Sequence, residues 1–211
     1  MNPKRILSLD MSSKTGWACI VSSDEGLQLI EYGIIQKSAE PRGKYPSNYV
    51  DWAYQVFGEI QKLIERFKPD TLVIEETVAG SKQVYSQKIL EWIHFLVAKF
   101  IKESNIEAVY LLTGSWRAET GCVMSKEEKL KNKAVREYKK QKEKETGTKP
   151  MAAYDINGKR IGLVGKKHVN VRRANEVYGA FLKRPLQKKD EDEADALMLA
   201  YCLHLRRVGN K

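Results

Sequence analysis

Apolar and polar positions in the first part of the chain form short, strand-like runs. Residues 5–10, 17–21 and 27–35 are mostly apolar, and small or polar residues with turn character separate them. Runs of this length between such turns are typical of β-strands. Three consecutive strands with short connections predict an antiparallel meander.

The next part of the chain changes twice between a helical period and a strand-like run. Apolar residues recur every three or four positions over 47–67, and the β-branched run 71–76 follows. A second helical pattern begins at Ser81, and an apolar run covers 108–112. This order predicts two parallel strands that extend the meander through right-handed crossovers. We therefore expect an α/β fold with a five-stranded mixed sheet and helices on both faces.

A lysine-rich segment interrupts this pattern over residues 118–165. Its first half mixes lysine with glutamate, and Ser125 and Glu128 have the spacing of a capping box, so we expect a solvated helix there. Asn157-Gly158 then predicts a tight hairpin. We interpret the segment as an insertion in a single domain spanning residues 1–211. A charged, solvated face without function remains one interpretation of it.

The last segment begins with a dense acidic stretch, residues 190–195, that continues into an Ala/Leu-rich helical pattern. Asp192, Asp195, Leu199 and Cys202 are three or four residues apart, so they share one helix face that starts acidic and turns apolar. Two carboxylates thus point toward the buried side, where like charges are unfavourable unless a cation lies between them. From this stretch alone, a metal site and a plain helix start are equally supported.

The other acids of this stretch have a simpler explanation. Asp190, Glu191 and Glu193 fall in the first turn, where the helix dipole stabilises negative charge. Asp190 and Glu193 also have capping-box spacing. We interpret these three as helix-start charges.

Composition and charge limit the class of protein. The 211 residues carry a formal net charge of +10 and are 42% hydrophobic, so we expect a globular protein with a polyanionic partner, of which nucleic acid is the commonest. No apolar run approaches the length that spans a bilayer and the start is not signal-like, so we expect a soluble intracellular protein. Cys19, Cys122 and Cys202 lack paired spacing, which argues against a disulfide framework and a cysteine zinc site.

Acidic residues end or begin three separate hydrophobic elements. Asp10 ends the first strand, Glu75 and Glu76 end the fourth, and Asp192 and Asp195 lie on the last helix. If the first and fourth strands are adjacent and parallel, their acids emerge at the same edge of the sheet. Oxygen-only ligands favour Mg²⁺ or Mn²⁺, and two such ions about 3.5–4 Å apart suit phosphodiester hydrolysis. In a basic protein this cluster favours a nuclease.

The same residues resemble the motifs of a known family. In order and spacing they are similar to the RuvC-type Holliday junction resolvases, a branch of the RNase H-like superfamily, and the similarity is closest to phage-type members. The resemblance covers residues 4–115 and 166–207. It rests on three motifs: Asp10 with Ser12 and Thr15-Gly16, then Val73-Ile74-Glu75, then Asp192-Glu193-Ala194-Asp195-Ala196-Leu197.

The resemblance implies an RNase H-like fold and a metal-dependent endonuclease. Asp10, Glu75, Asp192 and Asp195 would be the catalytic carboxylates and would bind two Mg²⁺ (or Mn²⁺) ions per active site. It also implies a homodimer that cuts four-way junctions and other branched DNA in the cytoplasm of a bacterial or phage-infected cell. Strand alternation places Glu76 on the face opposite Glu75, and the family pattern favours Glu75.

The chain departs from the family pattern in two places. Met11-Ser12 directly follows Asp10, where the cellular enzymes have Pro-Gly. Val78 stands where those enzymes carry an aromatic residue that contacts the centre of the junction. The dipeptide Trp116-Arg117, after the fifth strand, resembles the sequence of phage-type members. We expect Trp116 to be a packing residue. Strict preference for four-way junctions over flaps and three-way branches is therefore open.

Basic residues on elements beside the expected site are candidates for phosphate contacts, which give salt-sensitive affinity without reading bases. These candidates are Lys82, Lys88, Lys166, Lys167, Arg172 and Arg173.

Four other classes of protein share part of these features. An RNase H-like ribonuclease would use the same carboxylates on RNA–DNA hybrids or structured RNA, and a general debranching nuclease would accept a wider range of DNA. An actin-like ATPase also has Asp and Ser/Thr/Gly after its first strand, but it needs two such domains and this chain has room for one. A non-catalytic nucleic-acid-binding protein is disfavoured by four intact acids.

Overall fold

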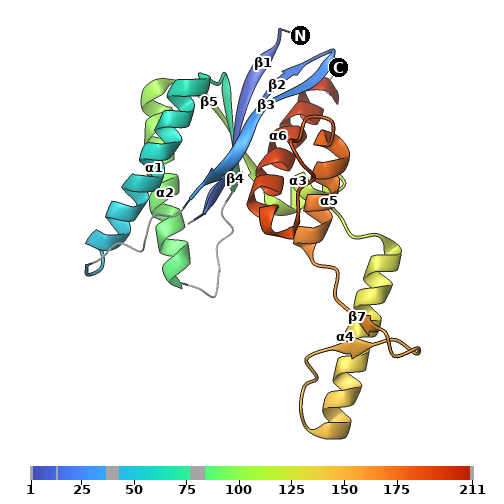
Figure 1. Cartoon of the computed structure of the whole chain (residues 1–211). Coiled ribbons are helices and arrows are strands. Elements are labelled where there is room, and N and C mark those ends of the chain that lie inside the picture. Colours follow the sequence, from blue (N-terminus) through green and yellow to red (C-terminus); the bar gives the residue numbers. More distant parts are fainter. Residues whose placement is uncertain (1, 13, 37–42, 77–83, 210–211) are drawn as a thin grey trace.

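The structure is a computed structural model and describes residues 2–12, 14–36, 43–76 and 84–209. Its central sheet contains β1 (Lys4–Asp10), β2 (Thr15–Ser23), β3 (Gly26–Ile35), β4 (Thr71–Glu76) and β5 (Glu107–Leu112). The strand order is β3-β2-β1-β4-β5 (Figure 1). β1, β2 and β3 form the antiparallel meander, and β4 is parallel to both β1 and β5. The predicted mixed sheet is confirmed.

Helices cover both faces of the sheet, as the sequence predicts (Figure 1). One layer contains α1 (Ser47–Phe67) and α2 (Val84–Ser104), and the other contains α3 (Thr113–Glu119), α5 (Lys166–Tyr178) and α6 (Glu191–Gly209). The expected start of the second helix at Ser81 lies outside the described residues. None of the helices within the described ranges is long and apolar enough to cross a membrane.

Alternating residues of the central strands supply both halves of the core. In β1, Leu7 and Leu9 pack in the cluster that includes the α1 and α2 side chains, whereas Ile6 packs in the cluster around α6. All three are fully buried. A strand buried on both faces is mostly apolar along its whole length, which explains the nearly continuous apolar runs seen in the sequence.

Helix α6 is fixed against the sheet and against α5 by two buried hydrogen bonds. The Ser8 hydroxyl of β1 donates to the carbonyl oxygen of Ala196 at 2.7 Å. The fully buried Tyr178 hydroxyl of α5 donates to the carbonyl oxygen of Leu197 at 3.0 Å. Both bonds hold the backbone of α6 just after its acidic first turns, so they set the position of the carboxylates there.

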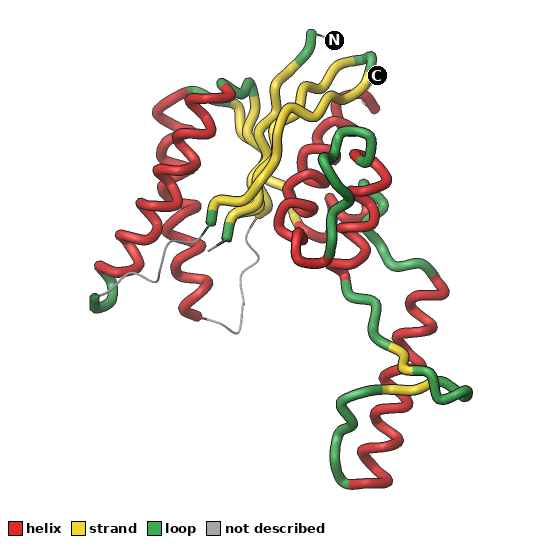
Figure 2. The backbone as a smooth tube through the Cα atoms, in the orientation of Figure 1, coloured by secondary structure: helices red, strands yellow, loops and turns green. Residues whose placement is uncertain are grey.

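The lysine-rich segment forms an arm that projects from the core (Figures 1 and 2). It consists of α4 (Lys126–Thr146) and a small hairpin of β6 (Ala153–Tyr154) and β7 (Arg160–Ile161). The predicted capping box of Ser125 and Glu128 is present. The hairpin turn uses Gly158 at φ 74°, a conformation that glycine adopts without strain.

Candidate active site

The ends of β1 and β4 place two carboxylates side by side. These strands pair in parallel with Leu9 opposite Ile74, so Asp10 and Glu75, the next residues of each strand, emerge at the same edge. Both side chains are half-buried. Glu76 is exposed, as alternation along the strand requires.

Helix α6 crosses this edge so closely that only glycine fits beneath it. A Cβ atom added to Gly16 of β2 would lie 2.0 Å from the carbonyl oxygen of Asp192. Gly16 pairs directly with Asp10 in the sheet. The Thr-Gly element of the first motif therefore lets α6 bring its carboxylates to the end of β1.

The four predicted carboxylates affect one another electrostatically. The pKa of Asp10 is raised well above its usual value, first by burial and then by the charges of Glu75, Asp195 and Asp192. A hydrogen bond to the Glu75 carboxyl raises it further. The structure thus brings the four residues into one acidic cluster.

Asp195 is the most buried member of the cluster, with 8% of its surface exposed. Arg117 of α3 donates to Oδ2 at 3.2 Å, and Asn170 of α5 donates to Oδ1 at 2.5 Å. Burial raises the pKa of Asp195 to about 6, against the opposing effects of the Asn170 hydrogen bond and the Arg117 charge. Two neighbouring helices therefore fix the orientation of this carboxylate.

The other two carboxylates also have protein partners. The Thr113 hydroxyl, at the start of α3, donates to Glu75. Lys14, in the turn after β1, lies 3.2 Å from Asp192. The positive charge that the acidic stretch requires is thus supplied in part by Lys14 and Arg117.

Sequence reasoning missed most of these partners. Trp116-Arg117 was noted as a motif, and Trp116 is fully buried as expected, with the Arg117 guanidinium 4.9 Å from its ring centre. Thr113, Asn170 and Lys14 carried no signal of their own, because their role depends on which elements meet in space.

Among the residues that the structure describes, no group of three acidic, histidine or cysteine side chains is already arranged to hold a metal ion.

One residue of the acidic stretch has a different role from the one predicted. Asp190 is not a capping residue of α6 but ends a separate short helix, η1 (Lys188–Asp190). It is buried, accepts from the backbone N–H of Gln187 at 2.8 Å and pairs with Arg184 at 2.6 Å. The sequence could not predict this, because the capping pattern does not distinguish a helix start from a turn that precedes it. Glu191 and Glu193 do lie in the first turn of α6.

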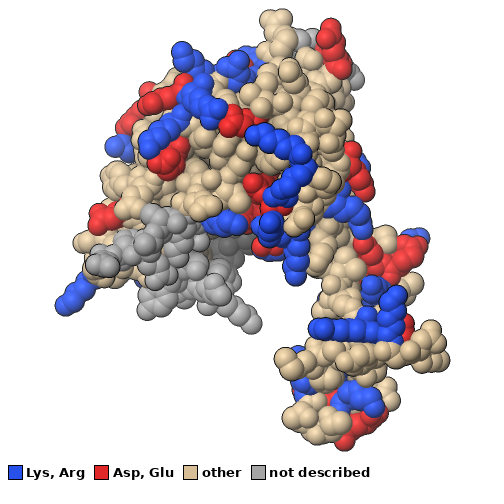
Figure 3. Space-filling model, viewed as in Figure 1, with Lys and Arg blue, Asp and Glu red and all other residues tan. Residues whose placement is uncertain are grey.

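Two of the predicted DNA-binding residues lie beside the cluster. Lys166 and Lys167 begin α5, both are exposed, and Lys167 pairs with Glu191 of α6. The charges of Asp192 and Asp195 also contribute to raising the pKa of Lys167, although burial opposes this. Figure 3 shows acidic atoms at the margin of the core framed by Lys and Arg atoms.

The other predicted DNA-binding residues lie elsewhere or have structural partners. Lys82 lies outside the described residues, and Lys88 of α2 lies 4.8 Å from the ring centre of Tyr45. Arg172 pairs with Glu128 of the arm at 2.5 Å. Arg173 donates to the carbonyl oxygen of Thr120 at 2.9 Å. Contact with DNA by these four residues stays a prediction.

The fold is that of the RNase H-like α/β class, and the solved structures that it resembles include junction resolvases. RuvC of Thermus thermophilus in complex with a Holliday junction substrate has a TM-score of 0.61 at 12% identity, covering 97% of this chain and 96% of that one. The yeast mitochondrial Holliday junction resolvase Ydc2 has a TM-score of 0.52 at 13% identity, covering 98% and 81%. No protein-family model and no curated protein matches the chain. The RuvC-type fold expected from the motifs is confirmed.

Proposed function

We propose that the protein is a structure-selective DNA endonuclease that hydrolyses phosphodiesters in four-way junctions and other branched DNA. The observation that carries this proposal is the convergence of Asp10, Glu75, Asp192 and Asp195 from two strands and a helix, with the pKa of Asp10 raised by burial and by the other three. A chain with a net charge of +10 has no structural need to gather negative charge in this way.

Divalent metal ions, Mg²⁺ or Mn²⁺ and two per site, complete the proposal. The donors are carboxylate oxygens, which these hard cations prefer, and the repulsion within the cluster is relieved by cations. When bound, such ions supply an activated water and stabilise the leaving oxygen of the phosphodiester. Asp10, Glu75, Asp192 and Asp195 would hold them.

The protein's own residues orient the cluster. Arg117 and Asn170 hold Asp195 from two helices, so its carboxylate needs little rearrangement to act as a ligand. Lys166 and Lys167 at the start of α5 would contact DNA phosphates near the cluster. Branched DNA is favoured as substrate because the similar RuvC structure holds a Holliday junction and because Ydc2 is a Holliday junction resolvase.

A homodimer is part of the proposal, because symmetric cutting of a junction needs two active sites. Helix α2 exposes Trp92 and Phe95, with 37% and 59% of their surfaces accessible. They lie three residues apart and share one helix face, which a second copy of the chain would cover. Sedimentation should give a dimer for the wild type and a monomer for the Trp92→Glu, Phe95→Glu double variant. A wild-type monomer at micromolar concentration would contradict this part.

The substrate class is tested by a panel of labelled nucleic acids with Mg²⁺ or EDTA. We expect symmetric, Mg²⁺-dependent nicks in a four-way junction and slower cutting of flaps and linear duplex. The Asp195→Asn variant should bind the junction and leave it uncut. Equal rates on flaps and three-way branches would instead indicate a general debranching nuclease. Preferential cutting of an RNA–DNA hybrid would indicate a ribonuclease.

A further inference from the structure

Helix α4 of the arm carries a line of positive charge that the fold does not use. Six cationic residues follow one another at spacings of three or four: Lys126, Lys129, Lys133, Arg136, Lys140 and Lys144. At 3.6 residues per turn these six fall within an arc of about 80° on the helix surface. We call them the α4 stripe. All six are exposed.

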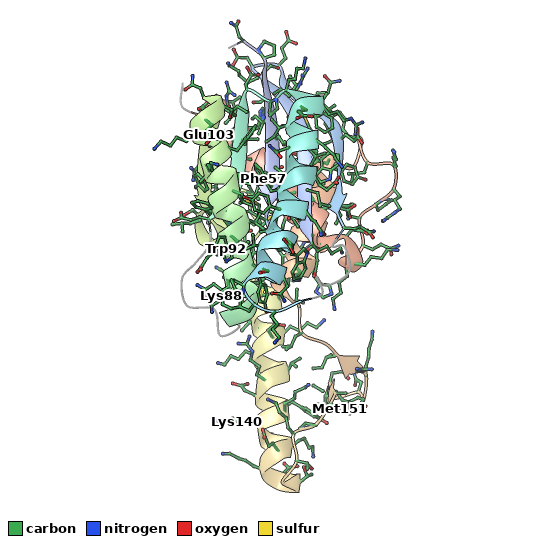
Figure 4. The ribbon with its side chains drawn as sticks, turned by 90° about the vertical axis from the view of Figure 1, so that its left-hand side faces the viewer. Phe57, Lys88, Trp92, Glu103, Lys140 and Met151 are labelled. Carbon is green, nitrogen blue, oxygen red and sulfur yellow. The ribbon has the colours of Figure 1, made fainter. Side chains whose placement is uncertain are left out.

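The stripe faces away from the contacts that hold the arm together. Val135 is buried, and Tyr138 packs against Tyr154 of the hairpin with ring centres 6.5 Å apart. Lys139 donates to the carbonyl oxygen of Met151 at 2.9 Å, which directs it toward the hairpin. Figure 4 places Lys140, a member of the stripe, on the flank of α4 away from Met151.

Helix stability does not account for the stripe. Like charges three or four residues apart repel one another and disfavour the helix, and every successive pair in the stripe has this spacing. Within the described residues, one member has an ion-pair partner, Lys133 with Glu137 at 3.9 Å. The stripe is therefore a row of cations of which one, Lys133, has an ion-pair partner among the described residues, and such a row is stabilised by a row of anions.

The arm is held firmly enough to present this row in a fixed place. Asn132 of α4 forms two hydrogen bonds with the backbone of Val164, each 2.8 Å long. Glu128, in the first turn of α4, pairs with Arg172 of α5. The base of the arm is thus tied to the helix that begins beside the acidic cluster. Figure 3 shows the molecule hollowed between the core and the arm.

We propose that the α4 stripe binds the phosphate backbone of a DNA duplex, one arm of the substrate whose branch point lies at the acidic cluster. Lys126 and Lys144 are about 27 Å apart along the helix at 1.5 Å per residue, which matches about eight base pairs of duplex at 3.4 Å each. The statement that this duplex is an arm of the nuclease substrate rests on the proposed nuclease function. The binding of a DNA duplex by the stripe does not depend on that function.

The test compares two triple variants that lose the same charge from the same arm. In the first, Lys129→Gln, Arg136→Gln and Lys140→Gln neutralise half of the stripe. In the second, Lys131→Gln, Lys149→Gln and Lys159→Gln neutralise three exposed lysines of the arm outside the stripe. Binding to a four-way junction and to a plain 20-base-pair duplex is measured by fluorescence anisotropy in EDTA, so that no cleavage is needed.

The stripe variant should bind both DNAs about 10-fold more weakly at moderate salt. The slope of log affinity against log salt should become shallower by about 2–3, since each lost phosphate contact reduces the steepness of the slope by about 0.9. The second variant should change affinity less than about threefold. A charge-keeping exchange, Lys129→Arg with Arg136→Lys and Lys140→Arg, should bind like the wild type, which separates lost charge from a damaged helix.

Equal losses in the two neutralised variants would overturn the proposal, because net charge and not the stripe would then set the affinity. An unchanged salt slope in the stripe variant would overturn it as well. Failure of the nuclease proposal looks different: no substrate would be cut with Mg²⁺, while the stripe variant would still lose duplex affinity.

Discussion

At the scale of single residues, the site is a balance between carboxylates that repel and side chains that hold them. Burial and the charge of Glu75 raise the pKa of Asp10, while Arg117 and Asn170 hold Asp195. The acids could be predicted from sequence because each follows or opens an apolar run. Their partners could not, because Arg117 is 78 residues from Asp195 in sequence and the pairing exists only once α3 meets α6.

The raised pKa of Asp10 gives a prediction about stability. Asp10→Asn removes a carboxyl group whose charged form burial and the neighbouring acids disfavour. In EDTA at pH 7 the variant should be more stable than the wild type, because it avoids the charged form that burial and the neighbouring acids disfavour. Adding Mg²⁺ should raise the melting temperature of the wild type and have little effect on the variant. Thermal unfolding followed by circular dichroism measures both. A variant that melts below the wild type in EDTA would contradict this view of the cluster.

At the scale of elements, the position of α6 decides where the carboxylates lie. The helix was predictable from its Ala/Leu-rich pattern, and its acidic stripe from residue spacing. The contact of α6 with β2 could not be predicted, although Thr15-Gly16 was recognised as part of a motif. The physical reason for the glycine is the close approach of the Asp192 carbonyl, which only the folded structure reveals.

A pair of glycine substitutions tests this contact. Gly16→Ala should destabilise the protein by at least about 2 kcal/mol, because its Cβ would meet backbone that cannot move without shifting α6. Gly58→Ala, in the interior of α1 with open space around it, should be neutral or stabilise by about 0.5–1 kcal/mol. Urea unfolding gives both values. Similar stability of the two variants would show that α6 does not depend on the close approach.

The ion pair before α6 gives a prediction about pH. The hydrogen bond from Arg184 lowers the pKa of Asp190 to about 2, below the ordinary value of 3.8. The folded state therefore favours the charged form, so the pair contributes stability above about pH 4 and loses it as the pH falls toward 2. Asp190→Asn should cost about 1–2 kcal/mol at pH 7, and the difference from the wild type should shrink between pH 4 and pH 3. Arg184→Gln should reproduce the loss, and the double variant should cost less than the sum. A loss that is the same at pH 3 and pH 7 would contradict the assignment.

At the scale of the whole molecule, sequence patterns predict the strand order of the sheet but not the direction in which the arm projects. Burial on both faces forces apolar runs in β1 and β4, and these runs made the order of parallel and antiparallel strands predictable. The segment 118–165 was predicted as a helix and hairpin. In the structure α3 continues to Glu119 and Cys122 packs in the core, so the projecting part of this segment begins with α4. The direction of the arm depends on Asn132 and on Arg172, which no local pattern reveals.

The central claim is that the carboxylate cluster performs metal-dependent cleavage, and the adjacent acids of β4 test it most directly. Glu75 belongs to the cluster, whereas Glu76 points to solvent on the other strand face. The measurement is the single-turnover rate of four-way junction cleavage with Mg²⁺ for Glu75→Gln and Glu76→Gln. We predict that Glu75→Gln loses at least about 100-fold in rate, while Glu76→Gln cuts at the wild-type rate and both variants bind the junction in EDTA. Equal rates for the two variants, or cleavage that persists in EDTA, would contradict the account.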